Sequence, residues 1–568
     1  MVTGARRRRP ALDRPARVAL LLGVAGVGYR LALLLLDVPG SNSDEGTFGL
    51  VALHIAQGRA HPVFLYGQRY MGVLESYLAA PLFVVAGPSW LALRLPLLVL
   101  YALFVYLMYR LTRRIGSPWF AALVVGLLAL GPERVVRDQL TAVGGRPEAK
   151  VAVAAMLLVA VGLAEGTLRR RRLAGVAFGA LAGVAVWSDW LIVPYLAAAG
   201  LVLVFALRRE LLGRAVALPL AGFAVGAAPM IYDNLTVPAG QRSWEVFQQV
   251  NAGDGGPVPA LGERLRGGFA EGVPLAAGLC PPGGCAGWQA WFGLLYPLLL
   301  ALAAGFAVVT LRRRVAHPVR PVTHLALVGA AALTLLGYVR SPLAASDPLA
   351  SARYLAVLQL SLPAVLWPLW AAAVTGLTGR AARFGRGSRS EPTGRGSRGS
   401  RGEPAGPGGR VGGAVGTAGG RVRAVGGAVA VGALAALVGV ALVATGLFVT
   451  DAAGIRAEER QARRLAETLR ADGPRHVYGD YWTCGRLVFH TAEEVVCAVV
   501  DDRLGPGQNR YPAYWRAVGR AERPGYVLRP GSAAERRLTG LLAERNVPAT
   551  VTDLGGYRLY RPASAVRP

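Results

Sequence analysis

The sequence lacks the short motifs that mark several large classes of enzyme and pump. It contains no Gly-x-x-x-x-Gly-Lys-Ser/Thr phosphate loop, no Gly-x-Ser-x-Gly elbow and no His-Glu-x-x-His zinc motif. These absences remove the sequence support for ATP-driven transport, α/β-hydrolase chemistry and zinc peptidase chemistry. Lysine is also nearly absent, since Lys150 is its one occurrence in 568 residues. Arginine therefore carries almost all of the basic charge.

Acidic residues are scarce relative to basic ones, which gives a formal net charge of +29. Nucleic-acid binding would need a folded soluble surface that displays this charge. Here the arginines instead occur in short segments between apolar runs, at 6–9, 169–172, 312–314 and 380–423. That distribution is typical of loops on the cytoplasmic side of a membrane. We therefore expect contacts with membrane lipids and none with nucleic acid.

Apolar runs dominate the rest of the chain, and 53% of all residues are hydrophobic. A helix of about 20 apolar residues crosses the bilayer core, so the pattern predicts a mainly α, polytopic membrane protein with about eleven spans. We place them at 18–36, 82–110, 118–131, 149–165, 173–188, 190–207, 214–231, 289–311, 322–339, 354–376 and 425–449. The shorter runs at 118–131 and 173–188 could be half-spans. The first run lacks a clear cleavage site, which favours an uncleaved helix.

The loop charges predict an orientation for these spans. With a cytoplasmic N-terminus, alternation places the arginines of 110–114, 169–172, 208–209 and 312–314 on the cytoplasmic side. The expected membrane region covers residues 1–376, with outer loops at 37–81, 132–148, 232–288 and 340–353. A disordered cytoplasmic Gly/Arg/Ser-rich linker is expected at 377–424. A last span at 425–449 and an extracytoplasmic α/β domain at 450–568 follow it.

The tail after residue 450 has the pattern of a small soluble module. Helical spacing is present at 456–470 and 533–544. Short strand-like runs occur at 476–478, 487–489, 495–500, 526–528 and 557–560. This mixture predicts an α/β domain.

Cysteine is rare, with four residues that fall into two pairs on the exported side. Cys280 and Cys285 share one loop, and Cys484 and Cys497 share the tail. An oxidising compartment favours two disulfides. Free thiols stay an alternative, because sequence spacing does not fix the Cα separation. No Cys-x-x-Cys pattern accompanies them, so a zinc site has no support.

The first exported loop carries the acidic pair Asp44–Glu45, directly before a helical pattern from Phe48 to Ile55. Carboxylates at this position stabilise a helix by roughly 0.3–1 kcal/mol, and Asp44 could be the N-cap. On position alone, capping and a catalytic function explain the pair equally well. A further acid, Asp189, lies beside Trp187 and Trp190. We interpret it as part of an interfacial aromatic belt.

Several short motifs follow the acidic pair in order along the exported side. They are a Tyr/Gly segment at 66–77, Gly87-x4-Ala92-x-Arg94, Gly144-Gly145-Arg146-Pro147-Glu148, Arg353-Tyr354 and, in the tail, Tyr478-Gly-Asp-Tyr-Trp482. Together with Asp44–Glu45, this set resembles the GT-C glycosyltransferases. It is most similar to the protein O-mannosyltransferase-like branch, which includes lipid A aminoarabinose transferase relatives. The resemblance extends over most of the chain.

The resemblance implies a hexosyl- or pentosyltransferase that uses a polyprenyl-phosphate sugar donor. The acceptor would be a hydroxyl of a protein, lipid or glycan on the extracytoplasmic face, and direct displacement would invert the anomeric carbon. Asp44 would be the base, with Glu45 orienting it or contacting a substrate. Arg353 is the leading candidate for holding phosphate, and Arg146 is a weaker one. The other candidates for substrate binding are Tyr70, Glu75, Asp138, Glu148 and Tyr354. No cofactor is expected, and a divalent cation has no support from the sequence.

Two other classes of function remain as alternatives. A flippase for lipid-linked sugars should have internal repeats with paired broken helices near the midplane. We find no such repeat, and the acidic residues concentrate outside the predicted spans. A non-catalytic cell-envelope assembly protein, whose tail binds a partner, is the second alternative.

Overall fold

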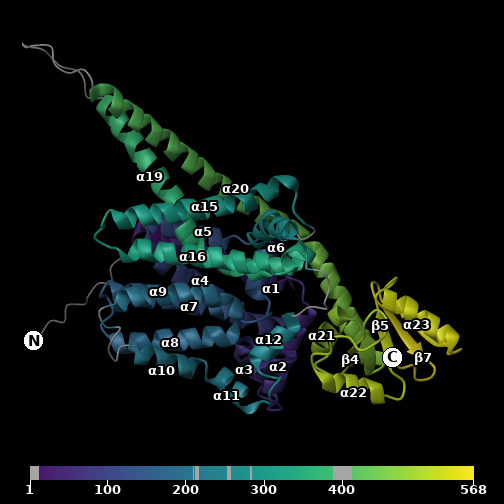
Figure 1. Cartoon of the computed structure of the whole chain (residues 1–568). Helices are drawn as coiled ribbons and strands as arrows, with labels where there is room; N and C mark the ends of the chain where they lie inside the picture. Colours follow the sequence, from purple (N-terminus) through teal and green to yellow (C-terminus); the bar gives the residue numbers. More distant parts are fainter. Residues whose placement is uncertain (1–11, 209, 211–215, 252–257, 282–283, 388–411) are drawn as a thin grey trace, which may run out of the picture.

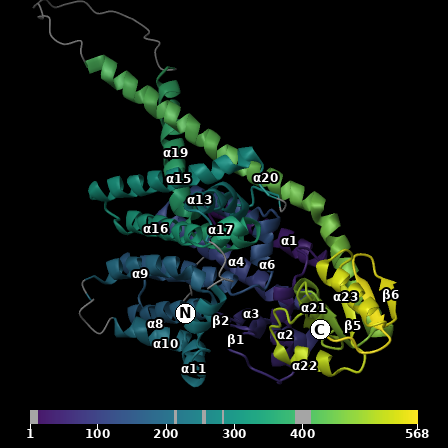
Figure 2. The same cartoon turned by 45° about the vertical axis from the view of Figure 1, so that its right-hand side comes forward.

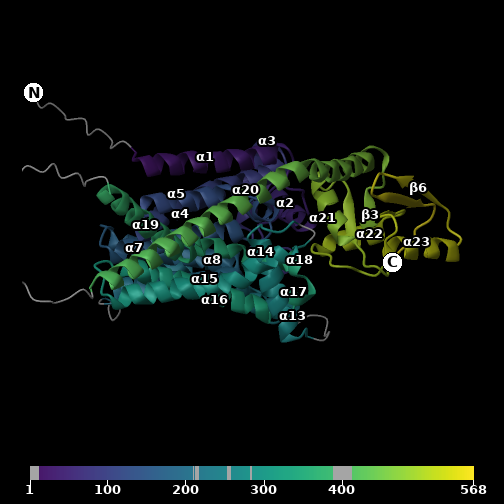
Figure 3. The ribbon, with the colours of Figure 1, turned by 90° about the horizontal axis from the view of Figure 1, so that it is seen from above.

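The computed structural model describes residues 12–208, 210, 216–251, 258–281, 284–387 and 412–568. A bundle of long helices forms most of the molecule, and a small α/β unit lies at one end of it (Figure 1). The long helix α20 (Gly412–Asp472) passes along the bundle and leads into that unit, as the turned view shows (Figure 2). Seen from above, the α/β unit lies beyond the end of the bundle (Figure 3).

Eight helical segments among the described residues are long and apolar enough to cross a membrane, and a bent pair can be counted as a ninth span. Seven of them contain α1 (Arg14–Leu35), α4 (Trp90–Ile115), α7 (Arg146–Ala164), η1 (Trp190–Ile192) with α9 (Val193–Leu207), α15 (Gly287–Arg312), α16 (Val319–Arg340), and α18 (Pro348–Ser351) with η3 (Ala352–Ser361) and α19 (Leu362–Gly387). The eighth is α20. The prediction of a multi-pass helical membrane protein is therefore confirmed.

The remaining two predicted spans, 173–188 and 214–231, fall outside this count. They form α8 (Arg171–Ser188), and α10 (Ala217–Gly226) followed by α11 (Ala228–Thr236). The helices α8 and α10 pack with their backbones in contact, because a Cβ at Gly179 would lie 1.8 Å from the Pro219 oxygen. Likewise, a Cβ at Gly226 would lie 2.1 Å from the Ala180 oxygen. Small residues at such crossings let apolar helices associate by van der Waals contact.

The bent pair consists of α5 (Pro118–Ala129) and α6 (Glu133–Leu140), which meet at 90°. The break frees the last carbonyl groups of α5, and the buried side chain of Arg30 binds them. Its Nη1 donates to the Ala129 oxygen at 2.8 Å and its Nη2 to the Leu130 oxygen at 3.1 Å. Its Nε donates to Gln139 Oε1 at 2.7 Å. One arginine of α1 thus satisfies a helix end that would otherwise be buried without partners.

The predicted span 82–110 is also broken in the structure. One helix, α3 (Leu74–Ala86), ends at Gly87, whose φ of 78° does not continue a helix. Ser89 then caps α4, accepting a hydrogen bond from the Ala92 amide at 3.1 Å. The Gly-Pro-Ser sequence between the two helices explains why one long apolar run becomes two elements.

The short elements around the first loop lie at the same end of the bundle as the α/β unit (Figure 2). They are α2 (Ser43–Ala56), β1 (Phe64–Leu65), and β2 (Gln68–Gly72), which pairs antiparallel with β1. Further along the chain come α12 (Ser243–Asn251), α13 (Leu261–Leu265), η2 (Arg266–Gly272), α14 (Val273–Ala276) and α17 (Leu343–Ser346). Among them, α12 contacts β2.

The prediction of a disordered linker at 377–424 is wrong at both ends of this segment. Residues 377–387 continue α19, and residues 412–424 already belong to α20, while the middle of the linker lies outside the described residues. The last span and the predicted helix at 456–470 are one continuous helix of 61 residues. No proline interrupts α20 after residue 412, so nothing local ends the helix between the two predicted segments.

The α/β unit has a five-stranded sheet in the order β4-β3-β5-β7-β6. The strands are β3 (His476–Gly479), β4 (Val496–Val499), β5 (Gly525–Leu528), β6 (Ala549–Asp553) and β7 (Arg558–Pro562), and the helices are α21 (Tyr481–His490), α22 (Pro512–Arg520) and α23 (Ala533–Glu544). Four predicted strands and the helix at 533–544 are confirmed. The run 487–489 is not a strand but part of α21, because it completes a helical apolar face that Cys484 begins.

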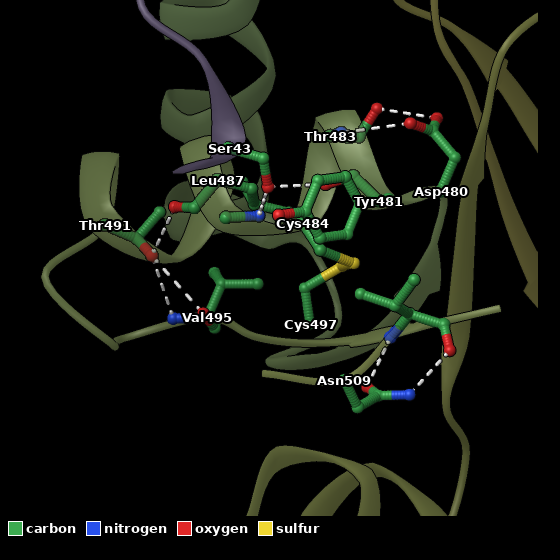
Figure 4. Close-up of a disulfide and its surroundings, with 12 residues drawn as sticks. Ser43, Asp480, Tyr481, Thr483, Cys484, Leu487, Thr491, Val495, Cys497 and Asn509 are labelled. Atoms are coloured by element: carbon green, nitrogen blue, oxygen red, sulfur yellow. Dashed lines mark hydrogen bonds between the residues drawn. A yellow bond between two sulfur atoms is a disulfide. The ribbon is translucent and has the colours of Figure 1, made fainter. Parts of the chain in front are cut away.

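Both predicted cysteine pairs are disulfides, Cys280–Cys285 and Cys484–Cys497. The second one joins α21 to β4 directly beneath the contact with α2 (Figure 4). At that contact the Gly485 amide donates a hydrogen bond to Ser43 Oγ at 3.0 Å, and Ser43 Oγ donates to the Tyr481 carbonyl. The disulfide therefore links α21, on which α2 packs, covalently to β4 of the five-stranded sheet.

The docking of α2 on α21 depends on glycine. A Cβ at Gly46 would lie 2.3 Å from the Gly485 oxygen, so Gly46→Ala should push the two helices apart. We expect a loss of about 1–3 kcal/mol in stability, measured as a lower melting temperature and faster proteolysis of the α/β unit. Gly28→Ala is the matched control, since nothing lies within 4 Å of its Cβ. Equal melting temperatures for the two variants would contradict this account.

Candidate active site

A cavity of about 410 Å³ lies where the bundle meets the α/β unit. Its charged lining residues come from distant parts of the chain: Asp44 of α2, Arg146 of α7, Asp189 after α8, Arg353 of η3 and Arg510 before α22. Among the predicted residues, Asp44, Tyr70, Arg146, Arg353 and Tyr354 line this one cavity. The structure thus brings together side chains separated by up to 466 positions in the sequence.

Asp44 occupies the centre of a hydrogen-bonded group. Its Oδ1 accepts hydrogen bonds from Arg510 Nη2 at 2.7 Å and from the Tyr481 hydroxyl. Its Oδ2 lies 3.7 Å from Arg353 Nη1. Asp44 is not the N-cap of α2, because Asn42 accepts the hydrogen bond from the Glu45 amide at 2.9 Å. The capping explanation for Asp44 is therefore wrong.

The surroundings of Asp44 keep it ionised. Burial alone would raise the pKa of this carboxyl group, because a charge is costly away from water. The positive charge of Arg510, the hydrogen bond from Tyr481 and the charge of Arg353 together outweigh burial and hold the pKa of Asp44 below its ordinary value. The carboxylate is therefore available as a proton acceptor at neutral pH.

The three arginines that line the cavity, Arg146, Arg353 and Arg510, each have N–H groups that make no hydrogen bond. Within the described part of the chain, Arg353 Nε, Arg510 Nη1, and Arg146 Nε and Nη1 are buried and make no hydrogen bond. Buried N–H groups without partners are rare and costly. Guanidinium groups match the geometry of phosphate oxygens. The arrangement is therefore well suited to an anion such as a phosphate group.

Glu45 points away from Asp44 into a buried ion pair. It is fully buried and accepts hydrogen bonds from Arg94 Nε at 2.7 Å and Nη2 at 2.6 Å. Arg94 Nη1 also donates to the Pro39 carbonyl at 2.8 Å. Glu45 is not among the residues that line the cavity. Its contacts fix the loop before α2, so it supports the position of Asp44.

Arg94→Ala should therefore destabilise the protein strongly, because it leaves the Glu45 charge buried without a partner. We expect a loss of about 3–5 kcal/mol, seen as a lower melting temperature in detergent. Arg113→Ala breaks an exposed pair with Asp13 and should cost less than about 1 kcal/mol. If both variants melt like the unmodified protein, the Glu45–Arg94 pair does not hold this loop.

The other predicted acids lie behind the cavity wall. Glu75 is buried and accepts a hydrogen bond from the Gly145 amide at 3.2 Å. Burial, and then the neighbouring charge of Glu148, raise the pKa of Glu75 well above its ordinary value. Asp138 of α6 is buried near Arg134 and Arg146. None of these three acids lines the cavity. Glu75 instead holds the Gly-Gly turn that precedes Arg146, and Asp138 interacts with the charge of Arg146.

Sequence reasoning missed three residues of this site. No sequence motif marks Arg510 as a site residue, since it lies in a loop of the α/β unit far along the chain. Tyr481 was part of the noted Tyr478–Trp482 motif, although no contact with Asp44 was predicted. Asp189, which its tryptophan neighbours predict to be part of an aromatic belt, lies in the cavity wall with its Oδ2 3.8 Å from Arg146 Nε. Among the described residues, no three His, Cys, Asp or Glu side chains come together as a candidate metal site.

Comparisons with known proteins find likeness at the level of structure. No protein-family model and no curated protein sequence matches the chain. The crystal structure of ArnT from Cupriavidus metallidurans bound to undecaprenyl phosphate matches with a TM-score of 0.54, 16% identity and coverage of 97% of each chain. The apo form of that protein matches with a TM-score of 0.50, 15% identity and coverage of 95% of this chain and 97% of the other.

The oligosaccharyltransferase from Archaeoglobus fulgidus, tethered with an acceptor peptide, is also similar, but the TM-score of 0.47 and identity of 13% are lower, and the match covers 97% of this chain and 74% of the other. At identities this low, a match shows the fold and not the activity. The resemblance predicted from the sequence motifs is confirmed at that level. The chain therefore shares the fold of ArnT over almost its whole length.

Proposed function

We propose that the protein transfers a sugar from a polyprenyl-phosphate donor to an acceptor hydroxyl in the Asp44 cavity. The observation that carries this proposal is the combination in one cavity of a carboxylate, Asp44, and three arginines with unused N–H donors. The ArnT structure with the same fold contains undecaprenyl phosphate, which supports this class of donor.

Arg353 and Arg510, which both contact Asp44, would bind the donor's phosphate, and Arg146 lines the same cavity. In the transfer, the acceptor oxygen forms a bond to the anomeric carbon while the bond from that carbon to the phosphate oxygen breaks. Polyprenyl phosphate leaves with the electron pair, and the arginines stabilise its charge. Asp44 takes the proton of the acceptor hydroxyl. Attack opposite the leaving group inverts the anomeric configuration.

Donor binding would also make Asp44 a better base. Arg353 and Arg510 contact Asp44 in the structure, and both lower the pKa of its carboxyl group. A phosphate group between the two arginines would share their charge. The pKa of Asp44 would then rise toward the range in which a carboxylate accepts a proton more readily.

The orientation predicted from the sequence is part of this proposal: a cytoplasmic N-terminus, with the cavity and the α/β unit on the extracytoplasmic side. A second, basic cavity brings together Arg110, Arg113, Arg114 and Arg320, at the ends of α1, α4, α7 and α16 opposite the Asp44 cavity. Basic residues concentrate on the cytoplasmic side of membrane proteins. The two disulfides, in the opposite segments, agree with an oxidising compartment there.

A transfer assay in proteoliposomes tests the proposal against a flippase. Polyprenyl-phosphate sugars with a labelled sugar are added together with a cell-envelope extract as the source of acceptor. The proposal predicts that labelled sugar moves to the extract and that free polyprenyl phosphate accumulates. If the donor crosses the bilayer but is recovered intact, the protein is a transporter and the proposal is wrong.

A further inference from the structure

Four aromatic side chains form a continuous wall that begins in the cavity and leads out of it. We call Tyr70, Trp190, Trp244 and Phe247 the aromatic wall. The rings of Trp190 and Trp244 are stacked at 6.1 Å and 25°, and those of Trp244 and Phe247 at 5.7 Å and 23°. Tyr70 packs edge-on against Phe247 at 5.3 Å. Three of the four line the cavity, while Trp244 is 57% exposed beside them.

Two buried polar atoms that make no hydrogen bond lie beside the aromatic wall, and one of them, Asp189 Oδ2, lies 3.8 Å from Arg146 Nε. Asp189 Oδ1 accepts a hydrogen bond from the Leu191 amide at 2.9 Å, which fixes the side chain. Among the described residues, Asp189 Oδ2 and Trp190 Nε1 are buried and make no hydrogen bond. The Asp189 side chain is 9% exposed and lines the cavity. A sugar hydroxyl could satisfy either atom, because a hydroxyl donates to a carboxylate and accepts from an indole N–H.

Flat aromatic faces next to a carboxylate fit a sugar ring. One face of a pyranose presents C–H groups, which contact the electron-rich face of an aromatic ring favourably. The hydroxyls around the edge of the sugar then hydrogen bond to neighbouring polar groups. We propose that the aromatic wall and Asp189 bind a carbohydrate acceptor, with its reacting hydroxyl directed toward Asp44. This inference rests on the proposed function, since it treats the Asp44 cavity as the place of transfer.

The geometry favours a saccharide over a polypeptide as the acceptor. One common mode of peptide recognition adds the peptide as a strand to a free sheet edge. The strand nearest the cavity, β2, pairs with β1 and contacts both α8 and α12. An interfacial aromatic belt is a weaker explanation, because three of these rings face a cavity that also contains charged side chains.

Saturation-transfer NMR on the purified full-length protein in nanodiscs tests the inference without any donor. The probes are a panel of methyl pyranosides and disaccharides, and a matched panel of Ser- and Thr-containing peptides. We expect saturable binding of at least one saccharide, with the strongest transfer to the C–H groups of one ring face. Trp244→Ala and Asp189→Asn should each weaken that binding about tenfold.

Trp288→Ala is the matched control, because Trp288 is 63% exposed at the start of α15 and lies outside the cavity lining. It should bind saccharides like the unmodified protein. Binding of peptides in place of saccharides, an absence of saccharide binding, or equal losses in Trp244→Ala and Trp288→Ala would overturn the inference. Because no donor is present, the result is independent of whether Asp44 is the base.

Discussion

Replacement of Asp44 by Asn is expected to lower the rate of sugar transfer by about 10²- to 10⁴-fold, the range found when a general base is removed. The asparagine oxygen can still accept hydrogen bonds from Tyr481 and Arg510, so the site should keep its shape. The asparagine side chain carries no charge, however, and cannot take the proton of the acceptor hydroxyl. Rates and the donor KM measured in proteoliposomes should show a fall in kcat with little change in KM.

Asp37→Asn is the control for Asp44→Asn. Asp37 lies in the same loop but is exposed and pairs with Arg463 of α20 at 3.1 Å. Its replacement should leave transfer unchanged. If Asp44→Asn transfers sugar at the normal rate, Asp44 is not the base. If Asp37→Asn loses as much activity as Asp44→Asn, the effect comes from the loop as a whole and not from the cavity.

Arg510→Ala is expected to have the second large effect, and it tests whether the α/β unit completes the active site. Arg510 lines the cavity, pairs with Asp44 at 2.7 Å and has a buried Nη1 without a partner. Loss of a charged hydrogen-bonding group should raise the donor KM about 10- to 100-fold. Arg510→Lys restores the charge but not the planar fork, so it should recover only part of the affinity.

The same variant should also change the pH dependence. Burial raises the pKa of Asp44, and the charge of Arg510 is the largest contribution that lowers it. In the unmodified protein the pKa of Asp44 is low, so its carboxylate becomes protonated only when the pH falls below that pKa. Without Arg510 that pKa rises, so the acidic limb of kcat should move to higher pH. An altered fold alone would lower activity equally across the pH range.

Arg537→Ala is the control for Arg510→Ala. Arg537 belongs to the same α/β unit, is exposed and pairs with Glu544 at 3.4 Å on α23. It should leave both the donor KM and the pH profile as they are. If Arg510→Ala behaves like Arg537→Ala, the α/β unit does not contribute to donor binding, even if Asp44 proves to be the base.

The helical membrane fold could be predicted because its signal is local. Runs of apolar residues and arginine-rich loops each reflect a physical requirement of the bilayer, and the structure has long apolar helices at nearly all of these runs. The errors have equally local causes. At 487–489 a short apolar run was assigned to a strand, although α21 places its side chains on a helical face. Short runs of this kind do not distinguish the two structures.

The site could be predicted only in part, because tertiary contacts decide it. Asp44 and Arg353 were found from motifs, and both line the cavity. Their neighbour Arg510 comes from a loop whose sequence shows nothing unusual. Glu45 and Asp44 are adjacent in the sequence, yet a helix turns them to different sides, one to Arg94 and the other to the cavity. Sequence alone does not show which way each carboxylate points.

The most direct test of the central claim is a cryo-electron microscopy map of the full-length protein in nanodiscs containing polyprenyl phosphate. The account predicts phosphate density in the Asp44 cavity, in contact with both Arg353 and Arg510, with the lipid chain leading from the cavity toward the membrane. Phosphate density at the opposite basic end instead, against Arg110 and Arg113, with the Asp44 cavity unoccupied, would contradict it.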